Sequence, residues 1–356
     1  MYPKLYFYYL SRAYLKNFIF ILLGLTLAFA TVNYFQNASS IKGGFNNQLL
    51  YSYYVAQEAL DILYPLALIF GAIMTKLDLV KNNTLGILYS FGYSKRNIIA
   101  PFLLIAFIVH LLFVYLNTTT FAYANDNADT MKRGGVEHFT KEHLFFKYND
   151  SFVYLRELDP IAKKIYDIDI FNLEGDRLIS TIHAQSATFN GTLWEAEHIT
   201  IKEHIYQGDT LQRFETTQQD RLNTLEGYKP QMIDQIYEGK NINIIDAYSG
   251  FELLDSQGLD SYKMRAALYS KLFFPLFALF LIIVIFFKIP PYARFMNLAV
   301  TLAASLGIVF LVWGLLFAFN QIGASGTVIP ELTTLLPIIL LAIYALNIYS
   351  KIDRRI

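Results

Sequence analysis

Residues 264–288 read MRAALYSKLFFPLFALFLIIVIFFK, and this stretch decides the fold class. Between Leu272 and Phe287 it carries no charged side chain. A helix needs about 20 mostly apolar residues to cross the roughly 30 Å hydrocarbon core of a bilayer. A run of this length and composition predicts a membrane-spanning helix. A strand or helix in the core of a soluble protein does not need so long an uncharged run.

Five further apolar runs of similar length surround this one. With it, they predict six spans, at Asn17–Tyr34, Val55–Leu77, Asn97–Leu116, Met264–Lys288, Asn297–Gln321 and Glu331–Tyr349. A polar, strand-like block between residues 116 and 264 separates three spans from the other three. The composition agrees, since 54% of the residues are hydrophobic and the chain has no cysteine, which excludes a disulfide-stapled domain. We therefore expect an α-helical membrane protein with two three-helix halves and an inserted β domain.

Basic residues are unevenly placed along the loops. The chain ends and the loops on one predicted side are rich in Lys and Arg, including Lys76, Lys81, Lys95 and Arg96, whereas the short loops on the other side offer only Lys42. By the positive-inside rule, both ends lie in the cytoplasm and the inserted block lies outside it. The formal net charge of zero argues neither for nor against nucleic-acid binding. No nucleic-acid partner is expected for a membrane protein of this kind.

The inserted block has the pattern of short strands. Tyr166, Ile168 and Ile170 alternate with acidic residues, and turns are expected at 173–176 and at Asn190–Gly191. This pattern predicts an antiparallel sandwich or jelly roll. Near its end, Ile245, Tyr248, Phe251 and Leu254 follow at helical spacing, with Asp246 as the expected N-cap.

Several stretches together resemble one family. Residues 64–98, YPLALIFGAIMTKLDLVKNNTLGILYSFGYSKRNI, and residues 261–294, SYKMRAALYSKLFFPLFALFLIIVIFFKIPPYAR, are similar to the second and fourth spans of the LptF/LptG family of lipopolysaccharide-export permeases. The stretches SFVYLRELD and IYDIDIFNLEGDRLISTIHAQSATFNGTLWEAEHI resemble the periplasmic β-jellyroll of that family. The KLFFPL sequence at 271–276 is more similar to the LptG branch than to the LptF branch.

The resemblance implies an organisation and a set of partners. Residues 1–119 would form one transmembrane half with a cytoplasmic coupling helix at about 78–93, residues 120–262 the periplasmic jellyroll, and residues 263–356 the second half. The chain would be an inner-membrane subunit that pairs with an LptF-type permease and an LptB-type ATPase dimer. It would pass lipopolysaccharide from the outer leaflet to LptC- and LptA-type bridge proteins.

The chain has no G-x-x-x-x-G-K-[ST] phosphate-binding loop. We therefore expect a transporter subunit that is not itself an enzyme and holds no cofactor, with ATP hydrolysed by a partner.

Two alternatives belong to other classes. A transporter driven by its own ion gradient would normally carry charged residues near the bilayer midplane, and spans one, three, five and six are almost free of them. A membrane receptor with an extracytoplasmic sensor domain needs an intracellular output module, and the cytoplasmic pieces are too short to fold alone.

The coupling segment is expected to present Thr84, Leu85, Leu88 and Phe91 to the ATPase, as the resemblance implies. Thr84 stands where the family has an acidic residue, so the corresponding ion pair is in question. The alternative is a plain amphipathic helix on the membrane surface.

The lipid site is expected at the outer ends of the spans. Phe20, Leu27 and Phe29 are predicted to line an apolar cavity for the acyl chains. Lys42, Arg265 and Lys271 would meet the phosphorylated head group, with Glu58 close by, as the resemblance implies. The alternatives are that these lysines and arginines reach ordinary lipid head groups, and that Glu58 and Asp61 only solvate a helix end.

No metal site is expected, because His138 and His143, or His198 and His204, lack the His-Glu-x-x-His pattern of a zinc protease.

Overall fold

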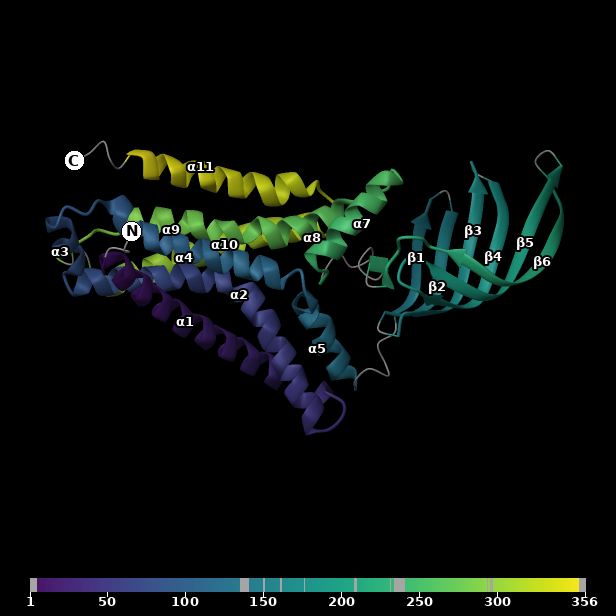
Figure 1. The fold of residues 1–356 in the computed structure, drawn as a ribbon, viewed down its shortest axis with the longest axis horizontal. Helices are drawn as coiled ribbons and strands as arrows, with labels where there is room; N and C mark the ends of the chain where they lie inside the picture. Colours follow the sequence, from purple (N-terminus) through teal and green to yellow (C-terminus); the bar gives the residue numbers. More distant parts are fainter. Residues whose placement is uncertain are drawn as a thin grey trace.

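The computed structural model describes residues 5–134, 141–149, 151–160, 162–175, 177–207, 210–230, 232–233, 241–292, 294 and 297–351. His138 lies outside these residues. A helical bundle occupies one end of the molecule and a curved β-sheet the other, with short helices between them (Figure 1). Within the described residues, six helices are long and apolar enough to cross a membrane, which confirms the predicted spans.

The helices of the first half are longer than the apolar runs that predicted them. They are α1 (Leu5–Asn37), α2 (Phe45–Lys81), α3 (Thr84–Ser90) and α4 (Lys95–Leu116), with a 3₁₀ turn η1 (Ala38–Ser40) after α1. At 1.5 Å per residue, the 37 residues of α2 extend about 55 Å, well beyond the roughly 30 Å of a hydrocarbon core. Hydropathy marks only the apolar middle of such a helix, because polar residues near its ends lower the local hydropathy.

The second half contains two irregular helices. The fourth span begins as α8 and continues, after a 3₁₀ turn that contains Pro275, as α9; a proline cannot donate the helical hydrogen bond, so the helix breaks there. The sixth span begins with a π-helical turn. The elements are α8 (Tyr262–Leu272), η4 (Phe274–Leu276), α9 (Phe277–Lys288), α10 (Leu298–Ala324), η6 (Glu331–Leu335) and α11 (Leu336–Lys351).

The bundle core lies mainly between α2, α4 and α9, with α1 packed closely on α2. A Cβ atom at Gly71 of α2 would lie 2.9 Å from Cα and 3.0 Å from the backbone nitrogen of Phe18 in α1. Near this contact, the Tyr14 hydroxyl donates to the Leu68 carbonyl (3.0 Å), and the Asn17 amide donates to the Thr75 hydroxyl (2.9 Å). The close approach of α1 and α2 thus requires a glycine at position 71.

The β domain is a single up-and-down meander. Its strands are antiparallel and lie in chain order, β1 (Lys141–Tyr148), β2 (Ser151–Asp159), β3 (Lys164–Glu174), β4 (Arg177–Phe189), β5 (Trp194–Gln207) and β6 (Thr210–Thr224). A jelly roll needs two sheets joined by Greek-key crossings, and the described strands contain no such crossing. The prediction of a jelly roll or sandwich is wrong here, because each strand pairs with the next one in the chain across a connection of only two to four residues.

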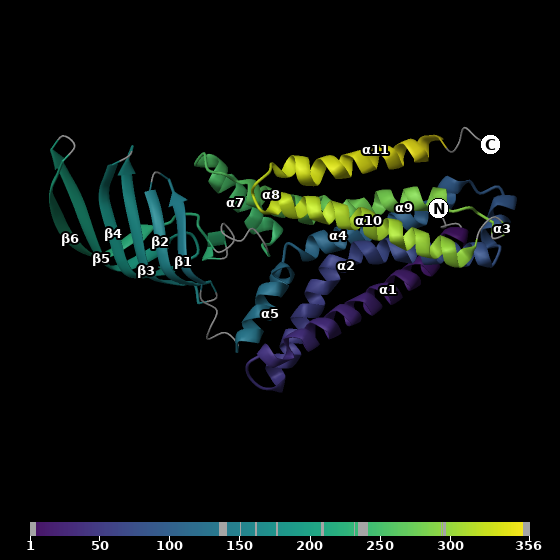
Figure 2. The ribbon, with the colours of Figure 1, turned by 180° about the vertical axis from the view of Figure 1, so that it is seen from behind.

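One row of residues crosses this sheet without ladder pairing, while the register on either side of it is unchanged. We call this row the crease; it consists of His143, Arg156, Asp167, Gln185, His198 and Asp220. Its members on β1, β3 and β5 have φ angles of 59°, 63° and 53°. The alternation of buried and exposed side chains along the strand shifts by one residue at the crease. The buried residues Leu155 and Leu158 of β2 are therefore three positions apart instead of two. The sheet as a whole is curved (Figure 2), and a slip of this kind in the alternation favours a bend.

Short helices connect the sheet to the bundle. A 3₁₀ turn η2 (Thr120–Tyr123) and α5 (Ala124–Arg133) follow α4, and α5 packs beside α2 (Figures 1 and 2). Before α8, α7 (Ile244–Ser256) packs on α8. Its N-cap is Asn243, whose side chain accepts from the backbone nitrogen of Asp246 (2.6 Å). The predicted helix is present, but Asp246 is its third residue and not its cap.

Candidate functional site

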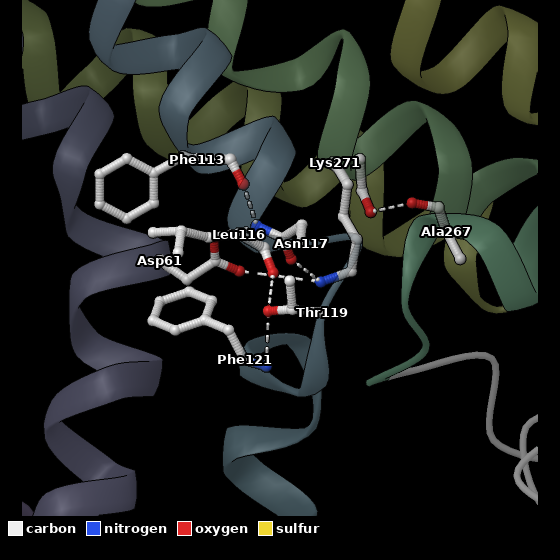
Figure 3. Close-up of polar contacts among 9 residues, drawn as sticks. Asp61, Phe113, Leu116, Asn117, Thr119, Phe121, Ala267 and Lys271 are labelled. Carbon is white, nitrogen blue, oxygen red and sulfur yellow. Dashed lines mark hydrogen bonds and ion pairs between the residues drawn. The ribbon is translucent and has the colours of Figure 1, made fainter.

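A network of polar side chains joins α2, α8 and the C-cap of α4 (Figure 3). The Lys271 ammonium of α8 donates to Asn117 Oδ1 at 2.5 Å and lies 3.7 Å from Asp61 Oδ2 of α2. The Asn117 amide donates in turn to Asp61 Oδ1 at 2.6 Å. Asn117 is the C-cap of α4, and its own carbonyl accepts from the backbone nitrogen of Ile244 at the start of α7. One buried asparagine therefore connects α2, α4, α7 and α8.

Arg265 takes part in a second network, between α8 and the π-helical turn η6. Its Nη1 lies 2.5 Å from Glu331 Oε1, and the Tyr269 hydroxyl donates to the same oxygen at 2.8 Å. Arg265 Nε and Glu331 Oε2 are buried without a hydrogen-bond partner among the described residues. The sequence predicted that Arg265 and Lys271 face a ligand, but both side chains are largely covered and paired with carboxylates of the chain itself.

The other two predicted head-group residues lie elsewhere on α2 and the turn before it. Lys42 is exposed in the turn between α1 and α2, where its backbone nitrogen donates to the Lys132 carbonyl at the end of α5 (2.9 Å). Glu58 is partly buried on α2, within electrostatic reach of Asp61 and of Asp129 on α5. Glu58 thus belongs to an acidic group of three carboxylates and is not placed by any described contact beside a cation that would bind phosphate.

The three predicted acyl-chain residues do not share one face of α1. Phe20 and Leu27 are 79% and 66% exposed, and with Leu23 they form an apolar stripe that no described residue covers. Phe29 instead packs against a buried cluster of Ile41, Tyr51 and Val55. The prediction of a common lining is therefore wrong for Phe29, because its position on the helix turns it toward α2.

At the opposite end of the bundle, α3 has the reverse orientation from the one predicted. Leu85 is fully buried in the core of the bundle and cannot meet a partner, while Leu88 is 8% exposed, belongs to the same core and reaches the wall of an open groove. Ile87 and Phe91, one helical turn apart, are 52% and 75% exposed. Thr84 is the first residue of α3, which follows Asn83 in a left-handed conformation (φ 55°). Of the predicted apolar docking residues, Phe91 is exposed and Leu88 lies at the groove wall, whereas the exposed Ile87 was not predicted.

An open groove adjoins this exposed face. It has a volume of about 670 Å³ and is lined by the first turns of α1 and by the end of α3, with Tyr6, Tyr8, Arg12, Phe91 and Tyr93 among its walls. On α3 itself, burial raises the pKa of the Tyr89 phenol to about 12, so this hydroxyl stays neutral in the packed helix. The segment 84–93 thus offers an aromatic surface on one side and packs on the bundle with the other.

Lys76 was counted among the loop charges, and the structure overturns this. Its side chain is 3% exposed, and its ammonium donates to the carbonyls of Phe286 and Ile289 (2.6 Å for the latter) and lies over the Phe286 ring. These carbonyls lie at the end of α9, just before Pro290. The last carbonyls of a helix have no hydrogen-bond donor within the helix itself, and here Lys76 supplies one. The sequence feature that could have revealed this burial is a lone lysine within an apolar run. An ionisable residue inside a membrane segment is almost always paired with another polar group.

The comparisons with known proteins agree with this architecture. No curated protein matches the chain. The sequence profile described as "Lipopolysaccharide export system permease LptF/LptG" matches residues 8–351, which includes all six spans and the β domain. The match does not distinguish LptF from LptG. Since it extends over nearly the whole chain, this six-span inner-membrane protein belongs to the LptF/LptG family of lipopolysaccharide-export permeases.

Proposed function

We propose that this chain is the LptG-type permease subunit of an ABC-type exporter, which pairs with an LptF-type permease and takes its energy from an LptB-type ATPase dimer. The observation that carries the proposal is the family match over six apolar helices and an inserted sheet. The absence of a phosphate-binding loop from the sequence fits a subunit that depends on a separate ATPase. An LptF-type role in the same complex is the second candidate.

The helices that the bundle leaves uncovered suit a two-permease assembly. Within the described residues, α1, α10 and α11 bury the smallest share of their apolar surface, while α2 is mostly buried. Lipid alone can cover such surfaces, but small residues such as Gly24, Gly307 and Gly314, whose Cβ positions meet open space, would also let a second helix approach. We place the lateral opening for lipopolysaccharide between α1 of one permease and the fifth span of the other.

The exposed stripe of α1 suits the acyl chains of the lipid. Each buried methylene is worth about 0.8 kcal/mol, so a lipid with several chains must keep them in an apolar path while its head stays at the wet rim. Phe20, Leu23 and Leu27 offer that path at helical spacing. In this proposal the sheet lies in the periplasm and its free edges pass the lipid to LptC- and LptA-type bridge proteins.

The two ion pairs, Arg265 with Glu331 and Lys271 with Asp61, provide cations that could bind the phosphate groups of the lipid head. Arg265 and Lys271 are each held by a carboxylate, Glu331 and Asp61, on a different span. A phosphate group carries more charge than a carboxylate and accepts bidentate bonds from arginine, so it can replace Glu331 as the partner of Arg265. Binding of the head group would then loosen the contact between the fourth and sixth spans.

A crosslinking experiment tests the path. A photoreactive amino acid at Leu23 or Leu27 should capture lipopolysaccharide in the assembled transporter, whereas one at Ile87, on α3 at the far end of the bundle, should not. Equal labelling at all three positions, or labelling at Ile87 alone, contradicts the proposed route. Purification with LptF-type or LptG-type partners, one at a time, separates the two subunit roles, since an LptG-type chain should form the active complex only with the LptF-type partner.

A further inference from the structure

The β domain contains a cluster of metal-ligating side chains that the transport function does not use. Asp167 and Asp169 of β3 and His183 of β4 bring two carboxylates and an imidazole together, with one ligand atom of each within 4.8 Å of the others. The His183 Nδ1 atom lies 2.9 Å from Asp169 Oδ1 and 3.4 Å from Asp167 Oδ1. Ligand atoms around a tetrahedral zinc ion at 2.0–2.2 Å lie roughly 3.3–3.6 Å apart. The separation of His183 from Asp167 already fits that range, whereas His183 and Asp169 are at hydrogen-bond distance and would have to open slightly to admit an ion.

The sheet itself fixes the three residues. Asp169 and His183 are direct cross-strand partners in the ladder between β3 and β4, so their side chains leave the sheet side by side. Asp167 belongs to the crease, and its φ of 63° departs from the extended backbone on either side of it. Two antiparallel strands hold the ligands more rigidly than a surface loop would, which favours a defined metal geometry.

Charge and access also suit a cation. The cluster opens into a surface depression of about 390 Å³ that is lined by Arg156, Glu157 and Tyr166 as well as by Asp167 and His183. Arg156 Nη1 lies 3.3 Å from Asp167 Oδ2, the carboxylate oxygen that faces away from the imidazole, and so can orient this carboxylate from outside. The carboxylates of Asp167 and Asp169 carry two negative charges, and Arg156 carries one positive charge. With a neutral His183 imidazole, these four side chains have a net charge of −1.

We propose that Asp167, Asp169 and His183 form a divalent-cation site that prefers Zn²⁺. A mixed oxygen and nitrogen donor set of two carboxylates and one histidine is typical of zinc, and the open side leaves a fourth position for water. A bound ion would join β3 to β4 beside the crease and so stiffen the sheet where it bends. The sequence predicted no metal site, because the histidines considered there were His138, His143, His198 and His204, and not His183.

The full-length protein in lipid nanodiscs, purified without a histidine tag, tests this proposal. Competition between the protein and a chromophoric chelator for Zn²⁺ should show one ion per chain. The variants Asp167→Asn, Asp169→Asn and His183→Ala should each bind at least about tenfold more weakly, since even the loss of a second-shell partner costs 10- to 100-fold. Asparagine tolerates positive φ, so Asp167→Asn removes the charge without disturbing the crease.

A matched control and a second readout complete the design. His204→Gln changes a histidine of the neighbouring strand β5 that bonds to the Leu178 carbonyl, outside the cluster, and should bind Zn²⁺ as the unmodified chain does. Zn²⁺ should also raise the unfolding temperature of the unmodified chain and of His204→Gln, but not that of the three cluster variants, because a ligand stabilises only the state that binds it. No binding by the unmodified chain, or equal binding by all variants, overturns the proposal.

Discussion

Replacement of Gly71 by alanine should loosen the contact between α1 and α2. The added Cβ would lie 2.9 Å from Cα and 3.0 Å from the nitrogen of Phe18, and both are backbone atoms that no rotamer change can move. An ordinary van der Waals contact begins near 3.4 Å, so α1 must shift outward by at least 0.5 Å. Overpacking of this kind costs about 1–3 kcal/mol.

The same shift would lengthen the two hydrogen bonds beside the contact, from Tyr14 to Leu68 and from Asn17 to Thr75. Hydrogen bonds between membrane helices are worth about 0.6 kcal/mol each on average. We therefore expect the free energy of unfolding of Gly71→Ala to fall by about 1–3 kcal/mol, because the overpacking and these bonds together cost about 2–4 kcal/mol and alanine regains up to about 1 kcal/mol of helix propensity.

Unfolding by sodium dodecyl sulfate in mixed micelles measures this loss. Gly24→Ala and Gly307→Ala are matched controls on α1 and α10, since a Cβ at either position meets nothing within 4 Å. In a helix interior alanine is favoured over glycine by up to about 1 kcal/mol, so both controls should be unchanged or slightly more stable. If Gly71→Ala proved as stable as Gly24→Ala, the close approach of α1 and α2 would be refuted.

Three further predictions concern other parts of the chain. Lys271→Met should lower the free energy of unfolding by about 1–3 kcal/mol, because it leaves the partly buried Asp61 carboxylate without its cation. Asp61→Asn in the same chain should restore part of that loss in a double-mutant cycle. Ile87→Asp with Phe91→Asp should abolish co-purification with the ATPase while leaving the unfolding transition within about 0.5 kcal/mol of the unmodified chain, since both side chains are exposed; retained co-purification would remove α3 from the docking surface. Burial raises the pKa of the Tyr228 phenol to about 12, above its ordinary value of 10, so the unfolded chain ionises first and stability should fall between pH 10 and 12; denaturant titrations of Tyr228→Phe should show a smaller fall over that range, and an identical fall would contradict the assignment.

Features encoded by local patterns could be predicted from the sequence. Six apolar runs and the alternation around Ile168 determine the spans and the strands, because burial in lipid or in a sheet core imposes those patterns residue by residue. Strand β6 was missed, since TLQRFETTQQDRLNT is polar on both faces and is held by its ladder with β5, not by burial. The order of the strands in the sheet could not be predicted from local patterns either, because turn residues do not specify which strands pair with one another.

The candidate site shows the same division. Residue types suggested Arg265 and Lys271 as important cations, but their partners Glu331 and Asp61 are 66 and 210 positions away in the chain and become visible only in the fold. On α3, apolar side chains occupy both faces, so hydrophobic periodicity could not decide whether Leu85 or Ile87 faces the bundle.

The hydrogen bonds of Lys76 also have a consequence for biosynthesis. Lys76 enters the membrane with α2, whereas the Phe286 and Ile289 carbonyls that it caps are made 210 and 213 residues later. At 5–20 residues per second, a ribosome needs about 10–40 s to cover that distance. During this interval an apolar helix must carry an uncapped ammonium group, which favours a position near the head groups or at a chaperone until α9 arrives. The first half of the bundle is therefore expected to complete its packing only after the fourth span has been inserted.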